Sequence, residues 1–213
     1  MDAVLFDFDL TLADSTTAIA NCTNHALQIL GHAPVNPQQV HRVIGVPRQE
    51  MFRLLTGVED VAIQDLFATH YSAHADEIMA EQTSLYECVG PTLTALRQRG
   101  VRIGIISMKF RWRIEAILRR LQLEDAVDLI LGWEDVTRQK PDPEGLLLAL
   151  ERLGVDRSRA IYVGDHPFDA EAARRAGVHF VGVRTGATDE ATWASCTRLG
   201  IVDDVAGVIS FLR

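Results

Sequence analysis

The sequence predicts an α/β fold in which helices cover both faces of a doubly wound, Rossmann-like parallel sheet, with a second, helical domain inserted early in the chain. Two observations predict it. Short, mainly apolar runs of strand length alternate with amphipathic helical segments through most of the chain. One stretch, residues 14–84, breaks the alternation because it shows helical spacing alone.

The apolar runs lack the alternating polar positions of strands that have one face in water. Strands of this kind are buried on both faces, which is typical of a parallel sheet covered by helices. The runs are residues 3–8, 101–106, 129–131, 160–163 and 178–183.

Amphipathic segments follow these runs, and each is predicted to be a helix. Three glycines come where a helix end needs a residue that can adopt a left-handed conformation, namely Gly100, Gly154 and Gly177. Apolar side chains with i, i+3, i+4 spacing are Ile114, Ile117, Leu118 and Leu121 after the second run, and Leu146, Leu147, Leu150 and Leu153 after the third.

The inserted unit, residues 14–84, is predicted to begin with a helix between Asp14-Ser15 and Gly31. Further helical segments are predicted at residues 38–44, 48–56 and 60–79. The core domain is then expected to comprise residues 1–13 and 85–213.

Composition excludes several classes of protein. With 47% hydrophobic and 23% charged residues, the 213-residue chain resembles ordinary globular proteins rather than disordered ones. Its net charge of −8 disfavours nucleic acid and anionic membrane surfaces as partners. Three cysteines without a CxxC pair, and the lack of a basic N-terminal region or a long apolar stretch, predict a cytoplasmic protein without disulfides or membrane spans. The oligomeric state is left open.

Polar residues stand where the apolar runs end, and in a parallel sheet these ends share the edge at which ligands bind. Asp7 is the strongest signal, because an unpaired carboxylate in a buried run is strongly disfavoured. The full set is Asp7, inside the end of the first run, with Asp9 and Thr11 just after it, Ser107 after the second run, Lys140 after the third, and Asp165 with Asp169 after the fourth.

Four carboxylates at one edge would repel one another without a cation, and Mg²⁺ binds carboxylates together with waters and a phosphate. Lys140 and the hydroxyl of Ser107 could hold that phosphate. Of Asp7 and Asp9, one could attack while the other moves protons.

Simpler interpretations remain open for most of these residues taken singly. Asp165 and Asp169, which follow the fourth run, could cap the next helix, and Ser107 could also be a helix cap. Lys140 could be an exposed lysine in a loop, and Thr11 could be a turn residue. Asp7 has no such alternative.

Four motifs, read in chain order, resemble those of the haloacid dehalogenase (HAD) superfamily: Asp7-Phe8-Asp9-Leu10-Thr11, Ser107, Lys140-Pro141, and Gly164-Asp165 with Asp169. The insertion resembles the helical cap of its phosphatase branch. The segment with Asp14-Ser15, Asn24 and Leu30-Gly31 is similar to the first cap helix of phosphoglycolate phosphatase-like members. The resemblance spans essentially the whole chain and implies a HAD core with a cap over residues 14–84.

The resemblance implies a role for each residue. Asp7 would be the nucleophile that forms an aspartyl-phosphate, and Asp9 would protonate the leaving oxygen and then activate water. Lys140 would neutralise developing charge. Asp7, the backbone carbonyl of Asp9, and Asp165 would bind Mg²⁺, supported by Asp169. Contacts to the phosphate are expected from Thr11 and Ser107. Lys109, which follows Ser107, could add positive charge at the phosphate or could simply lie on an exposed helix face. Arg48 stands where cap loops of related enzymes reach toward the substrate, but it could also be a solvated residue in the first turn of a helix.

The implied function is a Mg²⁺-dependent phosphatase for a small phosphorylated metabolite, with phosphoglycolate as the leading substrate. Alternatives are an inorganic pyrophosphatase, a sugar-phosphate phosphatase, a phosphomutase, or a non-catalytic phosphate-binding module. Two residues depart from the family pattern. Leu10 stands where this branch usually has glycine, and Met108 where asparagine is common, so the local backbone and one polar contact are in question.

Overall fold

The computed structural model describes residues 1–212, which form two compact units. The sheet unit comprises residues 1–13 and 85–212, and the helical unit comprises residues 14–84. No helix among residues 1–212 combines the length and the apolar character that crossing a bilayer requires. The three cysteines are all free thiols.

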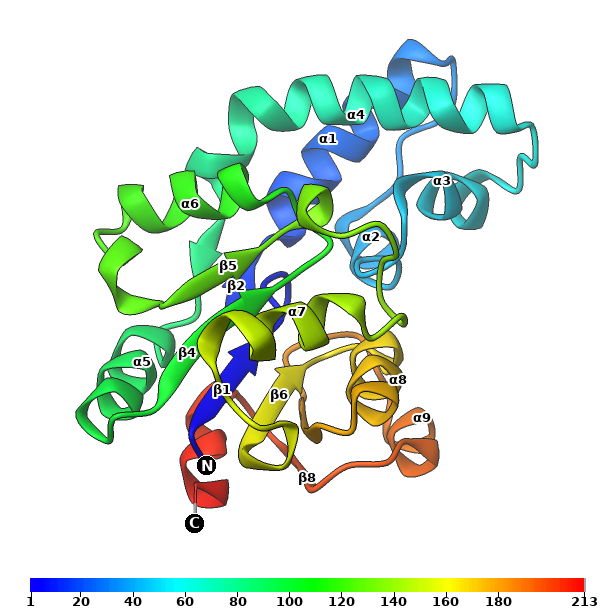
Figure 1. Ribbon diagram of the computed structural model, residues 1–213. Coiled ribbons are helices and arrows are strands. Elements are labelled where there is room, and N and C mark those ends of the chain that lie inside the picture. The colour runs from blue at the N-terminus through cyan, green and yellow to red at the C-terminus, as the bar shows by residue number, and fades with distance from the viewer. Residues whose placement is uncertain (213) are drawn as a thin grey trace. The chain divides into compact units, whose positions relative to one another are not determined.

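The sheet unit is built on six parallel strands in the order β5-β4-β1-β6-β7-β8 (Figure 1). The central strand β1 is buried along its whole length, as expected for a strand covered on both faces. The predicted α/β fold class with a parallel sheet is therefore confirmed. The strands are β1 Ala3–Phe6, β4 Arg102–Ile106, β5 Leu129–Leu131, β6 Ala160–Gly164, β7 His179–Val183 and β8 Gly200–Val202.

Helices follow the strands in the order that the alternation predicts. One face of the sheet shares a core with α7 and α8, in which Leu5 and Tyr162 pack against Leu146 and Ala173. The glycines expected at helix ends have φ values of +71° at Gly100, +66° at Gly154 and +72° at Gly177. The α-helices are α5 Val89–Gln98, α6 Arg111–Arg120, α7 Glu144–Leu153, α8 Pro167–Ala176 and α9 Glu190–Ser195. The 3₁₀ segments are Glu124–Ala126, Trp133–Asp135, Arg157–Arg159 and Val205–Phe211.

The helical unit contains α1 Thr16–Ile29, α2 Pro37–His41, α3 Arg48–Thr56 and α4 Val61–Gln82. Its core includes Phe52 and Phe67, whose ring centroids lie 5.0 Å apart. Asp60 caps α4 by accepting hydrogen bonds from two backbone N–H groups of its first turn. Two short strands, β2 Ala13–Asp14 and β3 Ser84–Leu85, pair at the boundaries of the unit.

The structure differs from the sequence prediction in several elements. The first strand ends at Phe6, so that Asp7 follows the strand instead of lying inside it. Strand β8 and helix α9 were not predicted, because β8 has only three residues, all half-buried, and α9 has six. The predicted segment 38–44 is shorter in the structure, since α2 ends at His41.

Candidate active site

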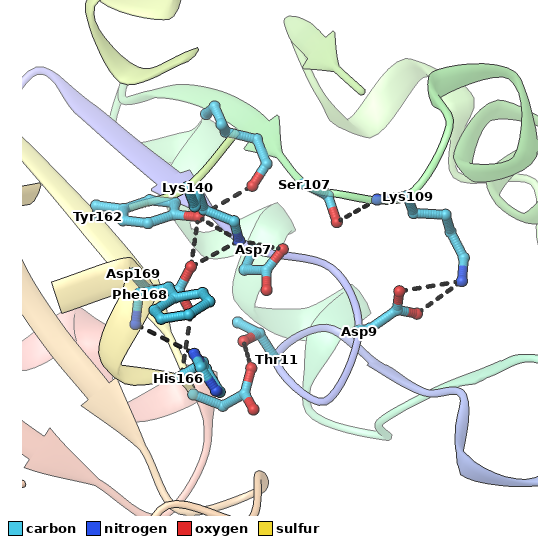
Figure 2. A network of polar contacts seen from close by, with 12 residues as sticks. Asp7, Asp9, Thr11, Ser107, Lys109, Lys140, Tyr162, His166, Phe168 and Asp169 are labelled. Carbon is cyan, nitrogen blue, oxygen red and sulfur yellow. Dashed lines mark hydrogen bonds and ion pairs between the residues drawn. The ribbon is translucent and has the colours of Figure 1, made fainter. Parts of the chain in front are cut away.

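Strand register brings the motif residues of three strands together. Phe6 of β1 pairs with Ile105 of β4 on one side and with Val163 of β6 on the other. Asp7 therefore emerges between the segments that carry Ser107 and Asp165. Figure 2 shows Asp7 together with Ser107, Lys140 and Asp169. The backbone continues this pairing one step further, since the Asp7 amide donates to the carbonyl of Val163 at 2.9 Å.

Lys140 lies against the Asp7 carboxylate. Its Nζ is 3.0 Å from Asp7 Oδ1 and 2.6 Å from Asp169 Oδ1, and its side chain is only 9% exposed. The interpretation of Lys140 as an exposed loop lysine is therefore wrong. Burial opposes its charge, but the carboxylates of Asp169 and Asp7 outweigh this effect and hold the pKa of Lys140 above its usual value.

Asp7, Asp165 and Asp169 form a buried cluster of carboxylates. One oxygen of each lies within 4.8 Å of the others, and no other group among residues 1–212 meets the same criterion for a metal site. Burial raises the pKa of Asp7 to about 6 even though Lys140 acts to lower it. Burial, reinforced by Asp169 and Asp7, raises the pKa of Asp165 well above its usual range.

The cluster fits a divalent cation, because a cation offsets the cost of these buried charges. Asp7 Oδ1 is buried and accepts no well-directed hydrogen bond from any residue among 1–212, although Lys140 lies near it. Asp169 is already occupied by protein donors, since Oδ1 accepts from Lys140 and Tyr162, and Oδ2 accepts from the backbone N–H of His166 at 3.0 Å. Asp7 and Asp165 are thus the carboxylates with oxygen atoms left for a metal.

The simpler interpretation of Asp169 also holds, because Asp169 and His166 form a capping box at the start of α8. The two oxygens of Asp169 do different things: Oδ2 caps the helix, and Oδ1 accepts a hydrogen bond from Lys140. Ser107, in contrast, is not a helix cap, since α6 begins after Phe110. The Ser107 hydroxyl accepts from the backbone N–H of Lys109 at 3.3 Å.

Leu10 adopts a left-handed conformation with φ of +58°, which explains why glycine is usual there. Two hydrogen bonds hold this backbone. The Leu10 amide donates to the carbonyl of Ala13 at 2.7 Å, and the Thr185 hydroxyl donates to the carbonyl of Leu10 at 2.5 Å. Leu10 therefore occupies a left-handed conformation that is unfavourable for a residue with a Cβ, and these two hydrogen bonds hold it there.

Asp9 and Lys109 form an ion pair in which the ammonium is buried and the carboxylate is half-buried. Lys109 Nζ lies 2.8 Å and 3.1 Å from the two carboxylate oxygens of Asp9, and the Lys109 side chain is 4% exposed. The carboxylate of Asp9 is not part of the acidic cluster. Thr11, also expected near a phosphate, donates its hydroxyl proton to Asp165 Oδ1 at 3.0 Å and so orients that carboxylate.

Arg48 begins α3 in the helical unit, where its guanidinium carbon lies 5.6 Å from the centroid of the Tyr71 ring. Motif reasoning missed the loop after β7. In this loop, the Thr188 hydroxyl donates to the backbone carbonyl of Asp165 at 2.6 Å, and Gly186 packs directly on the Asp165 side chain. It also missed Tyr162, whose hydroxyl contacts Lys140 and Asp169. An aromatic residue in a buried strand resembles ordinary core, so no sequence signal distinguished it.

The comparisons with known proteins all indicate the same family. The model of the haloacid dehalogenase-like hydrolase family matches residues 4–183. A pyrophosphatase PpaX from Bacillus velezensis is 34% identical over 85% of this chain and 82% of its own length. A phosphoglycolate phosphatase from Rhodospirillum rubrum is 31% identical over 99% of this chain and 90% of its own.

Among solved structures, a haloacid dehalogenase-like hydrolase from Bacteroides fragilis superimposes with a TM-score of 0.92. It is 40% identical in sequence, and the match covers 97% of this chain and 99% of that one. The family resemblance inferred from the four motifs is therefore confirmed, and so is the assignment to an enzyme class.

Proposed function

Because the chain belongs to the haloacid dehalogenase-like hydrolase family, we propose that it is a Mg²⁺-dependent phosphatase that hydrolyses a small, phosphoglycolate-like phosphate monoester through an aspartyl-phosphate on Asp7. The observation that carries this proposal is the environment of Asp7. The carboxylate is buried, and its Oδ1 lies 3.0 Å from the Lys140 ammonium and accepts no well-directed hydrogen bond from residues 1–212.

In the first step, an oxygen of Asp7 attacks phosphorus and the bond from phosphorus to the leaving oxygen breaks. Asp9, in its protonated form, gives its proton to that leaving oxygen, so that the alcohol departs and Asp9 is left as a carboxylate. In the second step, Asp9 takes a proton from water as the water attacks the aspartyl-phosphate, so that phosphate leaves and Asp7 is regenerated. Lys140 stabilises the charge on the phosphoryl oxygens in both steps.

Asp9 must leave its ion pair with Lys109 to act in this way. The incoming phosphoryl group supplies an anion that can replace the Asp9 carboxylate as the partner of Lys109. Thr11, which donates to Asp165, and Ser107, which lies at the end of the neighbouring strand, are further candidate contacts for the phosphate. In the helical unit, proposed as the cap that contacts substrate, Arg48 is the candidate basic residue.

The residues that would hold Mg²⁺ are Asp7, Asp165 and the backbone carbonyl of Asp9, with Asp169 supporting them through Lys140. When bound, the ion supplies positive charge that stabilises the phosphoryl oxygens during transfer.

Pyrophosphate is the second candidate substrate, favoured by the 34% identity to a pyrophosphatase. Both substrates use the same reaction at Asp7, so the difference between them concerns only the leaving group. A phosphomutase remains a third candidate, which a requirement for a bisphosphate primer would distinguish.

The test is phosphate release from phosphoglycolate, pyrophosphate and several sugar phosphates, with Mg²⁺ or with a chelator, by the wild type and Asp7→Asn. We expect release that needs Mg²⁺ and falls by at least about 10³-fold in Asp7→Asn, which keeps the shape of the side chain without a nucleophile. The preferred substrate identifies the leaving group. Near-normal turnover by Asp7→Asn, or activity without metal, would contradict the proposal.

A further inference from the structure

Tyr162 lies on β6 and is fully buried, yet its hydroxyl touches three polar groups (Figure 2). It lies 3.1 Å from Lys140 Nζ, 3.0 Å from Asp169 Oδ1 and 3.0 Å from the carbonyl oxygen of Ile106. The phenol has one proton, which it donates to Asp169 or to Ile106, and it accepts a hydrogen bond from Lys140.

Burial, followed by the charges of Asp169 and Asp7, raises the pKa of Tyr162 well above its usual value. The residue is therefore a neutral phenol at ordinary pH. A neutral acceptor holds an N–H of Lys140 without adding a fourth negative charge to a site that already contains three carboxylates.

An ammonium group has three N–H bonds. Lys140 directs two of them to fixed acceptors, Asp169 at 2.6 Å and Tyr162 at 3.1 Å. These two acceptors restrict rotation of Nζ, and the third N–H is left on the side of Asp7, whose Oδ1 is 3.0 Å away.

We propose that Tyr162 is a positioning residue for the reaction, which acts through Lys140: its hydroxyl, together with Asp169, anchors Nζ so that the remaining N–H faces Asp7 and the phosphoryl group that Asp7 carries. This inference rests on the proposed function. It assigns to the phenol a contribution to the transition state, since a loosely held cation stabilises developing charge less well than a fixed one.

A merely structural role is the competing interpretation, because the same hydroxyl links β6 to the end of β4 through Ile106. The two interpretations differ in what they change. Loss of a structural link lowers stability and leaves turnover of the folded protein unchanged, whereas loss of a positioning contact lowers kcat with little effect on KM.

The experiment uses Tyr162→Phe, which keeps the ring and removes only the hydroxyl. We expect kcat to fall about 10- to 100-fold, the range for a hydrogen bond to a charged group, with KM changed less than about threefold. Inhibition by vanadate, which adopts the five-coordinate geometry of phosphoryl transfer, should weaken by a similar factor. Inhibition by inorganic phosphate should change much less.

The control is Phe180→Leu, because the Phe180 ring packs beside Tyr162, with centroids 6.3 Å apart, and carries no hydroxyl. It should lower the melting temperature and leave kcat near the wild-type value well below that temperature. Unchanged kcat in Tyr162→Phe, or equal losses in both variants, would overturn the inference.

Wild type and Asp7→Asn are assayed in parallel to separate the two proposals. If the wild type releases phosphate in an Asp7-dependent manner and Tyr162→Phe is fully active, the role of Tyr162 alone is wrong. If the wild type shows no Asp7-dependent release, the proposed function fails and this inference fails with it.

Discussion

Charged residues are treated differently in the two units of the chain. Among residues 1–212, every buried charged side chain belongs to the sheet unit, and these residues are Asp7, Lys109, Arg113, Asp165 and Asp169. In the helical unit the buried polar residues are neutral, namely Ser15, Thr23 and Thr83. Its ion pair between Glu50 and Arg53 is short, at 2.6 Å, but its side chains are 38% and 42% exposed.

This difference in the burial of charged side chains shows which unit bears the free-energy cost of desolvating them. Removing charges from water is unfavourable and is only partly offset by pairing, so buried charges are weak evidence of stabilisation. They are stronger evidence of chemistry, because perturbed carboxylates and amines gather at functional sites. Exposed pairs such as that of Glu50 contribute little in either sense.

Among the substitutions that compare the two units, the largest effect is expected for Lys140→Met. Activity should fall by at least about 10²-fold, since the cation beside Asp7 is lost. Stability should also fall, by about 3–5 kcal/mol, because breaking a buried pair leaves uncompensated carboxylates at Asp7 and Asp169. Phosphate release and chemical denaturation measure the two effects.

The matched control for Lys140→Met is Arg53→Met, which removes a cation from the exposed pair of the helical unit. Its stability should stay close to that of the wild type, because the ion pair that it loses is exposed to solvent. Equal destabilisation by the two variants would mean that the buried ion pair contributes no more to stability than the exposed one.

An intermediate effect is expected for Gly186→Ala, which adds one methyl group beside the proposed metal ligand Asp165. The new Cβ would lie 2.1 Å from Asp165 Oδ2, far inside van der Waals contact, so the carboxylate must move. We expect the Mg²⁺ concentration for half-maximal activity to rise about 10- to 100-fold, as for other changes that disturb the support of a ligand.

Gly90→Ala is the control for this substitution, because a Cβ at Gly90 meets nothing within 4 Å. Its Mg²⁺ dependence should match that of the wild type. An unchanged Mg²⁺ requirement in Gly186→Ala would show that Asp165 is not held by this loop, or that it does not bind the metal.

The contrast between buried charged residues and ordinary exposed ones also explains which features could be predicted from the sequence. Asp7 could be proposed from the sequence because its carboxylate interrupts the apolar run of residues 3–8, and the ends of the other runs then pointed to Ser107 and Asp165 as candidates. Strand β8 was missed because three half-buried residues carry too little periodicity to detect.

Contacts that depend on tertiary structure could not be predicted. The pairing of Lys109 with Asp9 joins residues 100 positions apart, and neither residue type specifies the other. Tyr162 and Gly186 satisfy ordinary strand and turn preferences, so nothing in the pattern indicated a role. In the helical unit, the periodicity located the helices but could not select residues for substrate contact, because exposed polar residues are expected on any amphipathic helix.

The smallest effect is expected for Glu171→Gln, which tests whether exposure rather than membership of a unit decides the outcome. Glu171 belongs to the sheet unit, on α8, but is paired with Arg174 and Arg175 at the surface. Hydrogen bonds from Arg174 and Arg175 lower its pKa from 4.5 to about 2.

A carboxylate whose pKa is lowered in the folded protein stabilises it above the unfolded value, near pH 4.5, and this contribution is lost as the pH falls toward 2. Melting curves of wild type and Glu171→Gln should therefore differ by less than about 2 °C at pH 7, since the pair is exposed to solvent. The difference should shrink as the pH falls from 4.5 toward 3, and also in high salt, which screens exposed charges. If Glu171→Gln lost as much stability at pH 7 as Lys140→Met, exposed ion pairs of the sheet unit would contribute as much to stability as its buried ones.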